Sequence, residues 1–271
     1  MIRIGKHIAA AVFILLLLAL FGCARHAPAP SAPPQETPAE TTAPTAAPEP
    51  TPAVGAAHIV CIDPGHQRYG SSAPEPIGPG AAQTKARVTG GTQGRFTGIT
   101  EYELNLAVSL MLRDALTARG YAVVMTRETN DVDLSNADRA AIARSAGAEA
   151  FVRIHANGSD DPGKSGAMTI CMTPQNPYNA ALYPESRALS DCVLDALVAA
   201  TGCVRESVWE TDTMSGINWA AMPVTIVEMG YMTNEREDRL LAAEDYRARI
   251  AQGIADGIDA YFARLESEGT P

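Results

Sequence analysis

The chain has 271 residues, of which 46% are hydrophobic, so it can bury a sizeable core and is not disordered throughout. Its formal net charge is −10, and no cluster of lysines and arginines interrupts the acidic composition. We therefore expect no nucleic-acid partner, and we expect the protein to be a monomer.

The amino terminus has the pattern of an export signal. The basic stretch MIRIGKH precedes an apolar run, Ile8 to Phe21, which is shorter than the roughly 20 residues that a membrane-spanning helix needs. The run closes on Leu20-Phe21-Gly22-Cys23, which resembles the lipobox of bacterial lipoproteins, where the cysteine is lipidated and becomes the first residue. Phe21 is unusual in such a box, so an uncleaved signal anchor is the alternative. We expect residues 1–22 to be a signal peptide and Cys23 to tether a lipoprotein to the outer face of the cytoplasmic membrane. Both interpretations place the rest of the chain outside that membrane.

Residues 23–57 are predicted to be a tether. From residue 24 onward they are rich in proline, alanine and threonine, and Val54 is the only aliphatic side chain larger than alanine, so they cannot form a core. Extended polyproline II, at about 3.1 Å per residue, would let this stretch hold a domain up to on the order of 100 Å from the membrane. Residues 58–271 are then expected to form one folded domain.

Four cysteines remain in that domain, too few for a disulfide framework. Cys61 and Cys171 lie in apolar runs and are expected in the core. Cys192 and Cys203 flank the end of one predicted helix and are candidates for a disulfide.

Short apolar runs alternate with helical patterns along the domain. The predicted strands are His58–Asp63, Tyr121–Thr126, Ala150–Ile154, Ala167–Met172 and Val224–Glu228. The predicted helices are Thr100–Arg119, Ser135–Ser145, Pro184–Thr201 and Arg236–Leu265, the last broken near Glu244. This alternation predicts an α/β layer fold with a largely parallel sheet. The run from Ala167 is the candidate for an antiparallel strand, because no helix precedes it.

The glycine- and proline-rich segment 67–98 is too long for an ordinary connection, since structureless loops beyond about 15 residues are usually functional or disordered. It leaves from His66 and returns at the helix that begins at Thr100. We expect it to form a rim or lid over a site. A mobile insertion is the alternative.

Polar side chains gather at the carboxyl ends of three predicted strands, where ligands of open α/β sheets bind. The first strand runs into Asp63-Pro64-Gly65-His66, and the third ends in Arg153-Ile154-His155-Ala156-Asn157. The last strand ends at Glu228. Two histidines and a glutamate therefore occupy equivalent positions at one edge.

A fourth candidate comes from the stretch TGITEYELNLAVSLML. Thr100 and Glu103 have the spacing of a capping box, which gives Glu103 a structural role at the start of the helix. Glu101 is at the first helical position and has no such partner. We therefore expect Glu101, and not Glu103, to point from the helix end toward the same edge.

Together, His66, Glu101 and His155 form a set known from catalytic zinc sites, which leave a fourth position for water. Glu228 is then a candidate general base for that water. Structural interpretations also exist: Asp63 and His66 as turn residues, His155 as a hydrogen-bonded histidine, and Glu228 as the partner of a buried Arg153. Those interpretations require four coincidences at one edge of the sheet.

Four stretches carry a family resemblance. In this order, IVCIDPGHQ, TEYELNLAVSLML, VRIHANGS and PVTIVEMGYMTN resemble the zinc-dependent N-acetylmuramoyl-L-alanine amidases of the amidase type 3 family, over about residues 58–265. The resemblance implies one catalytic domain in residues 58–271, with a twisted, largely parallel mixed sheet flanked by helices on both faces. It implies hydrolysis of the amide between N-acetylmuramic acid and L-alanine in peptidoglycan. By this resemblance the zinc (Zn²⁺) ligands are His66, Glu101 and His155, and the catalytic glutamate is Glu228.

The chain departs from the family pattern at Gln67, where glycine is more frequent, and in the longer segment before Glu101. These departures bear on substrate selectivity and gating and remove no ligand.

The mechanism implied is metal-assisted amide hydrolysis. Zinc polarises the carbonyl and lowers the pKa of its water toward about 7, while Glu228 passes the water's proton to the leaving alanine nitrogen. Asp63, Arg153 and Asn157 are candidates for orienting the ligands or for contacting substrate. The expected partners are peptidoglycan and, through Cys23, the membrane. Two alternatives stay open: a zinc peptidase that cuts within the stem peptide, and a catalytically silent wall-binding lipoprotein.

Overall fold

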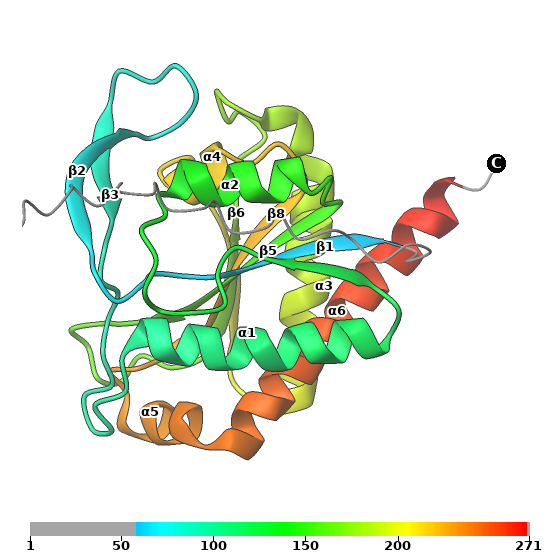
Figure 1. Ribbon diagram of the computed structural model, residues 1–271. Helices are drawn as coiled ribbons and strands as arrows, with labels where there is room; N and C mark the ends of the chain where they lie inside the picture. The colour runs from blue at the N-terminus through cyan, green and yellow to red at the C-terminus, as the bar shows by residue number, and fades with distance from the viewer. Residues whose placement is uncertain (1–57, 270–271) are drawn as a thin grey trace, which may run out of the picture. The chain divides into compact units, whose positions relative to one another are not determined.

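Figure 1 shows the computed structural model, which describes residues 58–269. The expected signal peptide, Cys23 and the tether lie outside the described residues. Among the helices of the described part, none has both the length and the apolar character needed to cross a membrane.

A six-stranded mixed sheet lies at the centre of the domain, in the order β4-β1-β5-β8-β6-β7 (Figure 1). Its strands are β1 (Ile59–Pro64), β4 (Ala122–Met125), β5 (Ala150–Asn157), β6 (Ala167–Cys171), β7 (Arg205–Glu210) and β8 (Val224–Tyr231). The first four in this spatial order run parallel, whereas β6 is antiparallel to β8 and parallel to β7. The largely parallel sheet and the antiparallel direction of β6 are confirmed.

Helices cover both faces of the sheet (Figure 1). One face carries α1 (Glu101–Ala118), α3 (Tyr183–Thr201), α5 (Glu235–Ala242) and α6 (Glu244–Gly269). The other face carries α2 (Asn136–Ser145) and α4 (Ser215–Asn218), and a short 3-10 turn, η1 (Ala180–Leu182), precedes α3. The predicted break in the last helix is confirmed, because Ala243 between α5 and α6 is extended, with φ −82° and ψ 131°.

The strand β1 explains why the central apolar runs are continuous. Val60 and Ile62 pack into the core beneath α1, α3 and α6, whereas Cys61 packs into the core beneath α2 and α4. Successive side chains of a strand point to opposite faces, so a strand covered on both faces needs apolar residues at every position. The buried sheet therefore gives a rigid base to the residues at its carboxyl edge.

Three strands were not predicted from the sequence. The edge strand β7 alternates exposed and half-buried side chains, so it has no apolar run to reveal it. The segment 67–98 is not a structureless loop, because β2 (Ser71–Pro76) and β3 (Thr84–Val88) pair within it as an antiparallel hairpin. The sequence SSAPEP of β2 resembles a loop because proline and serine are poor strand formers.

Two side chains at the end of α4 hold that hairpin against the domain. Trp219 donates its indole N–H to the Pro76 carbonyl at 3.0 Å, and Asn218 donates its amide to the Ile77 carbonyl at 3.0 Å. These bonds fix the tip side of the hairpin to the helix layer on that face.

The disulfide between Cys192 and Cys203 was a wrong prediction, because all four cysteines of the described residues are free thiols. Cys61 and Cys171 are buried, as expected.

Candidate active site

The turn after β1 brings His66 to the edge of the sheet. Gly65 donates its backbone N–H to the Ile154 carbonyl at 2.9 Å, and a Cβ built on Gly65 would lie 2.2 Å from the ring of His155. No residue larger than glycine fits so close an approach. His66 itself has a φ of 59°, the only positive φ of a non-glycine residue within the described range. The strand therefore ends in a left-handed turn that presents the imidazole at the edge.

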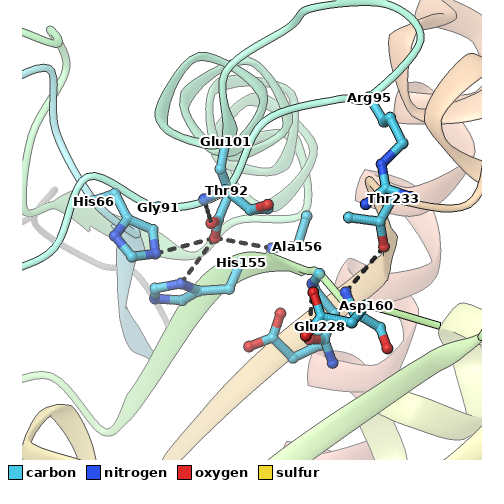
Figure 2. A pocket seen from close by; sticks show the side chains of 13 residues that line it. His66, Gly91, Thr92, Arg95, Glu101, His155, Ala156, Asp160, Glu228 and Thr233 are labelled. Carbon is cyan, nitrogen blue, oxygen red and sulfur yellow. Dashed lines mark hydrogen bonds and ion pairs between the residues drawn. The ribbon is translucent and has the colours of Figure 1, made fainter. Parts of the chain in front are cut away.

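The start of α1 separates two glutamates. The Glu103 carboxylate accepts hydrogen bonds from the Thr100 hydroxyl at 2.6 Å and from the Thr100 backbone N–H at 3.4 Å, which confirms the capping box. Glu101 occupies the first helical position and is only 3% exposed. Figure 2 shows its carboxylate between the two imidazoles. The predicted capping role of Glu103 is confirmed, and Glu101 lies beside the two histidines as expected.

Three side chains converge on one point (Figure 2). Glu101 Oε1 lies 3.2 Å from His66 Nε2 and 3.2 Å from His155 Nδ1. One ligand atom from each residue lies within 4.8 Å of the others. Within the described residues, no other group of histidine, cysteine, aspartate and glutamate side chains is arranged to hold a metal ion.

The contacts of the two imidazoles fit a metal site. His66 Nδ1 lies 2.9 Å from the Thr89 carbonyl, which can only accept, so this nitrogen carries the proton. The other ring nitrogen, Nε2, faces the Glu101 carboxylate and is the nitrogen left for a metal ion. Burial lowers the pKa of His155 to about 4, so its ring is neutral at pH 7 and free to coordinate. Two imidazoles and one carboxylate are a donor set that fits zinc.

Backbone amides and one side chain orient Glu101. Its Oε2 accepts from the Thr92 N–H at 2.8 Å, and its Oε1 accepts from the Ala156 N–H at 3.2 Å and from Asn105 Nδ2 at 3.3 Å. Burial raises the pKa of Glu101, but hydrogen bonds to the two histidines outweigh it and hold the pKa below its usual range. The carboxylate is therefore ionised. The role of Asn105 was not predicted, because the sequence does not show which polar residues of a helix face a buried carboxylate.

Glu228 lies beside the cluster. It pairs in register with His155, on the neighbouring strand, and both residues lie inside their strands because β5 and β8 continue beyond the predicted ends. Its Oε2 is buried without a hydrogen-bond partner among the described residues. Burial, and then the charge of Glu101, raises the pKa of Glu228 to about 8. The predicted structural alternative is wrong, since Arg153 pairs with Asp63 and not with Glu228.

An open cleft of about 510 Å³ surrounds these side chains. Gly91, Thr92 and Arg95 line it, so the end of the segment 67–98 forms part of its rim. Asn157 lines it too, but its side-chain oxygen accepts from the next backbone N–H at 2.9 Å, and its side chain forms no hydrogen bond with the three clustered residues.

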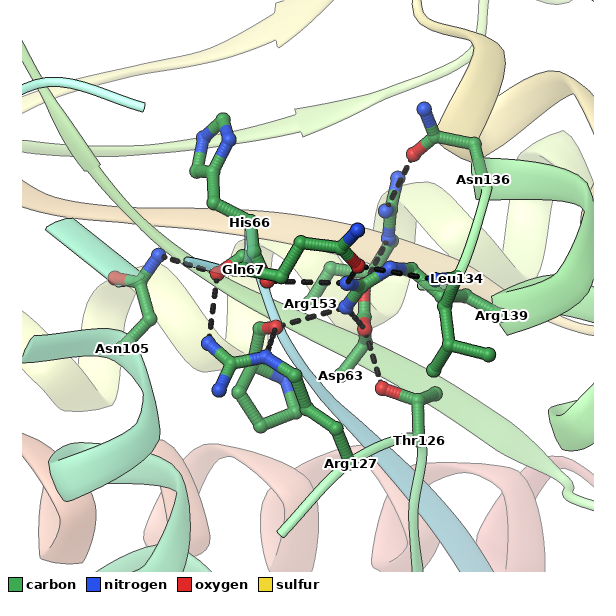
Figure 3. Close-up of polar contacts among 12 residues, drawn as sticks. Asp63, His66, Gln67, Asn105, Thr126, Arg127, Leu134, Asn136, Arg139 and Arg153 are labelled. Atoms are coloured by element: carbon green, nitrogen blue, oxygen red, sulfur yellow. Dashed lines mark hydrogen bonds and ion pairs between the residues drawn. The ribbon is translucent and has the colours of Figure 1, made fainter. Parts of the chain in front are cut away.

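Asp63 does not reach the cluster, and Figure 3 shows it at the centre of a buried ionic network. Its two oxygens accept from Arg139 Nη1 at 2.6 Å and from Arg153 Nε at 2.8 Å, and Thr126 donates its hydroxyl to the same carboxylate. Burial would raise the pKa of Asp63, but the two guanidinium groups outweigh it and hold the pKa well below its usual range. Arg153 is therefore the counter-ion of Asp63 and does not line the cleft.

The same network holds the turn that carries His66 (Figure 3). Arg127 donates to the carbonyls of Pro64 at 2.8 Å and Gly65 at 3.0 Å, and Arg139 donates to the His66 carbonyl at 3.0 Å. Asp63 thus orients a candidate ligand indirectly, through an arginine. Neither Arg127 nor Arg139 was predicted, because the sequence does not show which arginines are buried.

Comparisons with known proteins identify the family of the chain. Residues 60–260 match the model of the Amidase_3 family, described as N-acetylmuramoyl-L-alanine amidase. The chain is 30% identical over 211 residues to N-acetylmuramoyl-L-alanine amidase LytC of Bacillus subtilis, and the match covers 78% of this chain and 36% of LytC. The chain thus spans about a third of the length of that relative.

Other relatives match over nearly their whole length. N-acetylmuramoyl-L-alanine amidase Rv3717 of Mycobacterium tuberculosis is 26% identical over 218 residues, which cover 79% of this chain and 90% of that protein. The crystal structure of the amidase Ami1 of Mycobacterium smegmatis superposes with a TM-score of 0.68 at 30% identity, covering 77% of this chain and 98% of Ami1. The chain therefore belongs to the Amidase_3 family of N-acetylmuramoyl-L-alanine amidases.

Proposed function

We propose that the protein is a zinc-dependent hydrolase that cleaves the amide bond between N-acetylmuramic acid and L-alanine in peptidoglycan. One observation carries the proposal: in a chain of this family, ligand atoms of His66, Glu101 and His155 lie within 4.8 Å of one another in an open cleft. These three residues would hold the ion. Zinc bound there would supply a Lewis acid that polarises the amide carbonyl and acidifies water.

The surrounding chain fixes these ligands before any ion binds. The Thr89 carbonyl sets the tautomer of His66, and the amides of Thr92 and Ala156 fix the Glu101 carboxylate. Groups that orient ligands in this way typically matter 10- to 100-fold or so for metal affinity or activity. The arrangement is therefore preorganised for a cation.

Glu228 is the proposed general base. It takes a proton from the water that attacks the carbonyl carbon, and it delivers a proton to the alanine nitrogen as the C–N bond breaks. The products are the lactyl carboxylate and the free amino terminus of the peptide. A base works best with a pKa near the operating pH, and the pKa of Glu228 is raised to about 8, first by burial and then by Glu101. A cation beside Glu101 would offset that second cause and bring the pKa nearer neutrality.

Digestion of purified peptidoglycan tests the proposal. The zinc-loaded protein should release whole stem peptides with a free alanine amino terminus and leave the glycan strands intact, as read by mass spectrometry. A chelator should stop the release, and added zinc should restore it. Fragments cut within the stem peptide would show a peptidase instead. A protein that binds the wall, retains no zinc and releases nothing would be a silent wall-binding protein.

We also propose that the protein acts outside the cytoplasmic membrane, as a lipoprotein anchored through Cys23. The support is the amino-terminal sequence, with its basic start, short apolar run and terminal Leu20-Phe21-Gly22-Cys23. Peptidoglycan lies on that side of the membrane, so the location agrees with the proposed substrate.

A further inference from the structure

A buried carboxylate holds the short segment 94–98 at one end of the cleft. Asp238, on α5, is fully buried, and its Oδ2 accepts from the backbone N–H groups of Phe96 at 2.7 Å and Thr97 at 2.9 Å. Its Oδ1 accepts from the Thr97 hydroxyl at 2.5 Å. A buried charge is costly unless several donors satisfy it, so this contact fixes the backbone of the segment to the helix.

Two further contacts fix the backbone around Arg95. Arg95 donates its N–H to the Met232 carbonyl at 3.0 Å, and Gly94 donates its N–H to the Ile99 carbonyl at 2.9 Å. A Cβ on Gly94 would lie 2.2 Å from Asp238 Oδ1, so only glycine lets the segment dock this closely. The Arg95 main chain is therefore held rigidly next to Thr233.

The side chain of Arg95 is the one lysine or arginine that lines the cleft. The other charged side chains of the lining, apart from the two histidines, are the carboxylates of Glu101, Asp160 and Glu228. Among the residues that the structure describes, nothing forms an ion pair or a side-chain hydrogen bond with Arg95. A fixed backbone thus presents a free guanidinium to an otherwise acidic cleft.

The position of Arg95 separates it from the reacting groups. In Figure 2, Arg95 and Thr233 stand at one end of the cleft and His66 stands at the other. A group bound by Arg95 is therefore a part of the substrate other than the scissile amide.

We propose that Arg95 is a specificity-determining residue that binds a carboxylate on the peptide side of the substrate. This inference rests on the proposed function. The lactyl carboxyl of N-acetylmuramic acid is consumed in the scissile amide and the N-acetylated sugars are uncharged, so the free carboxylates lie on the peptide. A guanidinium matches a carboxylate with two parallel hydrogen bonds, which an amide in the same place cannot reproduce.

Two synthetic substrates test this assignment on the full zinc-loaded protein. Both are N-acetylmuramoyl-L-alanyl-γ-D-glutamyl peptides, one with the free α-carboxylate of the glutamyl residue and one with that carboxylate converted to a primary amide. Wild type should prefer the carboxylate. Arg95→Ala should lower kcat/KM for the carboxylate substrate by about 10- to 100-fold, mainly through KM, and leave the amide substrate unchanged. Arg95→Lys should recover part of the loss as a point charge.

The matched control is Arg236→Ala, which removes the same charge from an exposed position on α5 outside the cleft lining. It should leave both substrates unaffected. Equal losses on both substrates in Arg95→Ala, no loss on either, or a wild type without preference would each overturn the assignment. A wild type that cleaves neither substrate would overturn the proposed function itself, and this inference with it. Melting temperatures of the variants check that each is folded.

Discussion

At the scale of single residues, two glutamates two positions apart do different work. Glu101→Ala should lose bound zinc and activity together, because it removes the one carboxylate of the cluster. Glu103→Ala should keep the metal and lose only about 0.5 to 2 kcal/mol of stability, since it removes a helix cap. Zinc content and a thermal melt of each variant check this. Loss of zinc in Glu103→Ala with retention in Glu101→Ala would reverse the assignment.

Glu228 offers a second test at this scale, because it lines the cleft without belonging to the three-residue cluster. Glu228→Gln keeps the volume and removes the proton acceptor, so turnover should fall by about 10²- to 10⁴-fold while zinc content stays the same. Stability should not fall, because Arg153 pairs with Asp63 and loses no partner. Zinc content, melting temperature and digestion rate, measured on one preparation, distinguish a general base from a structural residue. An unstable variant with full activity per folded molecule would remove Glu228 from the mechanism.

At the scale of elements, the turn after β1 depends on a charge buried beneath it. Asp63 neutralises Arg139 and Arg153, whose side chains are 1% and 4% exposed. Asp63→Asn would leave two buried cations unpaired, so we expect a loss of about 3 to 5 kcal/mol in the free energy of unfolding. The exposed control Asp131→Asn, which breaks a surface pair with Arg68, should cost at most about 1 kcal/mol. Denaturant melts of both variants measure the difference.

The stability that Asp63 contributes should depend on pH in a definite direction. The pKa of Asp63 is lower in the folded state than in the unfolded state, so its contribution to stability is present above the unfolded pKa of about 3.9. It is lost as pH falls further, because the unfolded state then binds a proton that the folded state does not. The gap between wild type and Asp63→Asn should therefore be constant near neutral pH and narrow below about pH 4. A gap that widens in acid would show that Asp63 does not act through its charge.

Sequence patterns predicted the elements that are buried and regular. The strand ends came within a few residues of those observed, and the capping box correctly separated Glu101 from Glu103. What could not be predicted depends on long-range contacts. The hairpin β2–β3 is held by Trp219 and Asn218, more than a hundred residues away, and its own residues are poor strand formers. Nothing in the sequence shows that the arginines around Asp63 are buried.

At the scale of the whole molecule, the described domain and the amino-terminal segment meet different physical requirements. The chain is acidic overall, and the domain buries most of its large apolar side chains in two cores. Residues 23–57 cannot form a core and are predicted to act as a spacer. The proposed attachment to the membrane therefore depends on the first 23 residues, which lie outside the described part of the chain.

Replacement of Cys23 tests that attachment. Lipidation needs the thiol of Cys23, so Cys23→Ala should abolish metabolic labelling with a fatty acid and either release the protein from the membrane or leave an unprocessed precursor. Cys192→Ala, which alters a free thiol of the folded domain, should label as wild type does. Fractionation of cells, with mass determination of the amino terminus, distinguishes release from retention of the signal. Labelling that persists in Cys23→Ala would reject the lipobox. A membrane-bound protein of full length and without label, in wild type as in the variant, would establish the uncleaved signal anchor, because an apolar run of 14 residues would then hold the protein without a lipid.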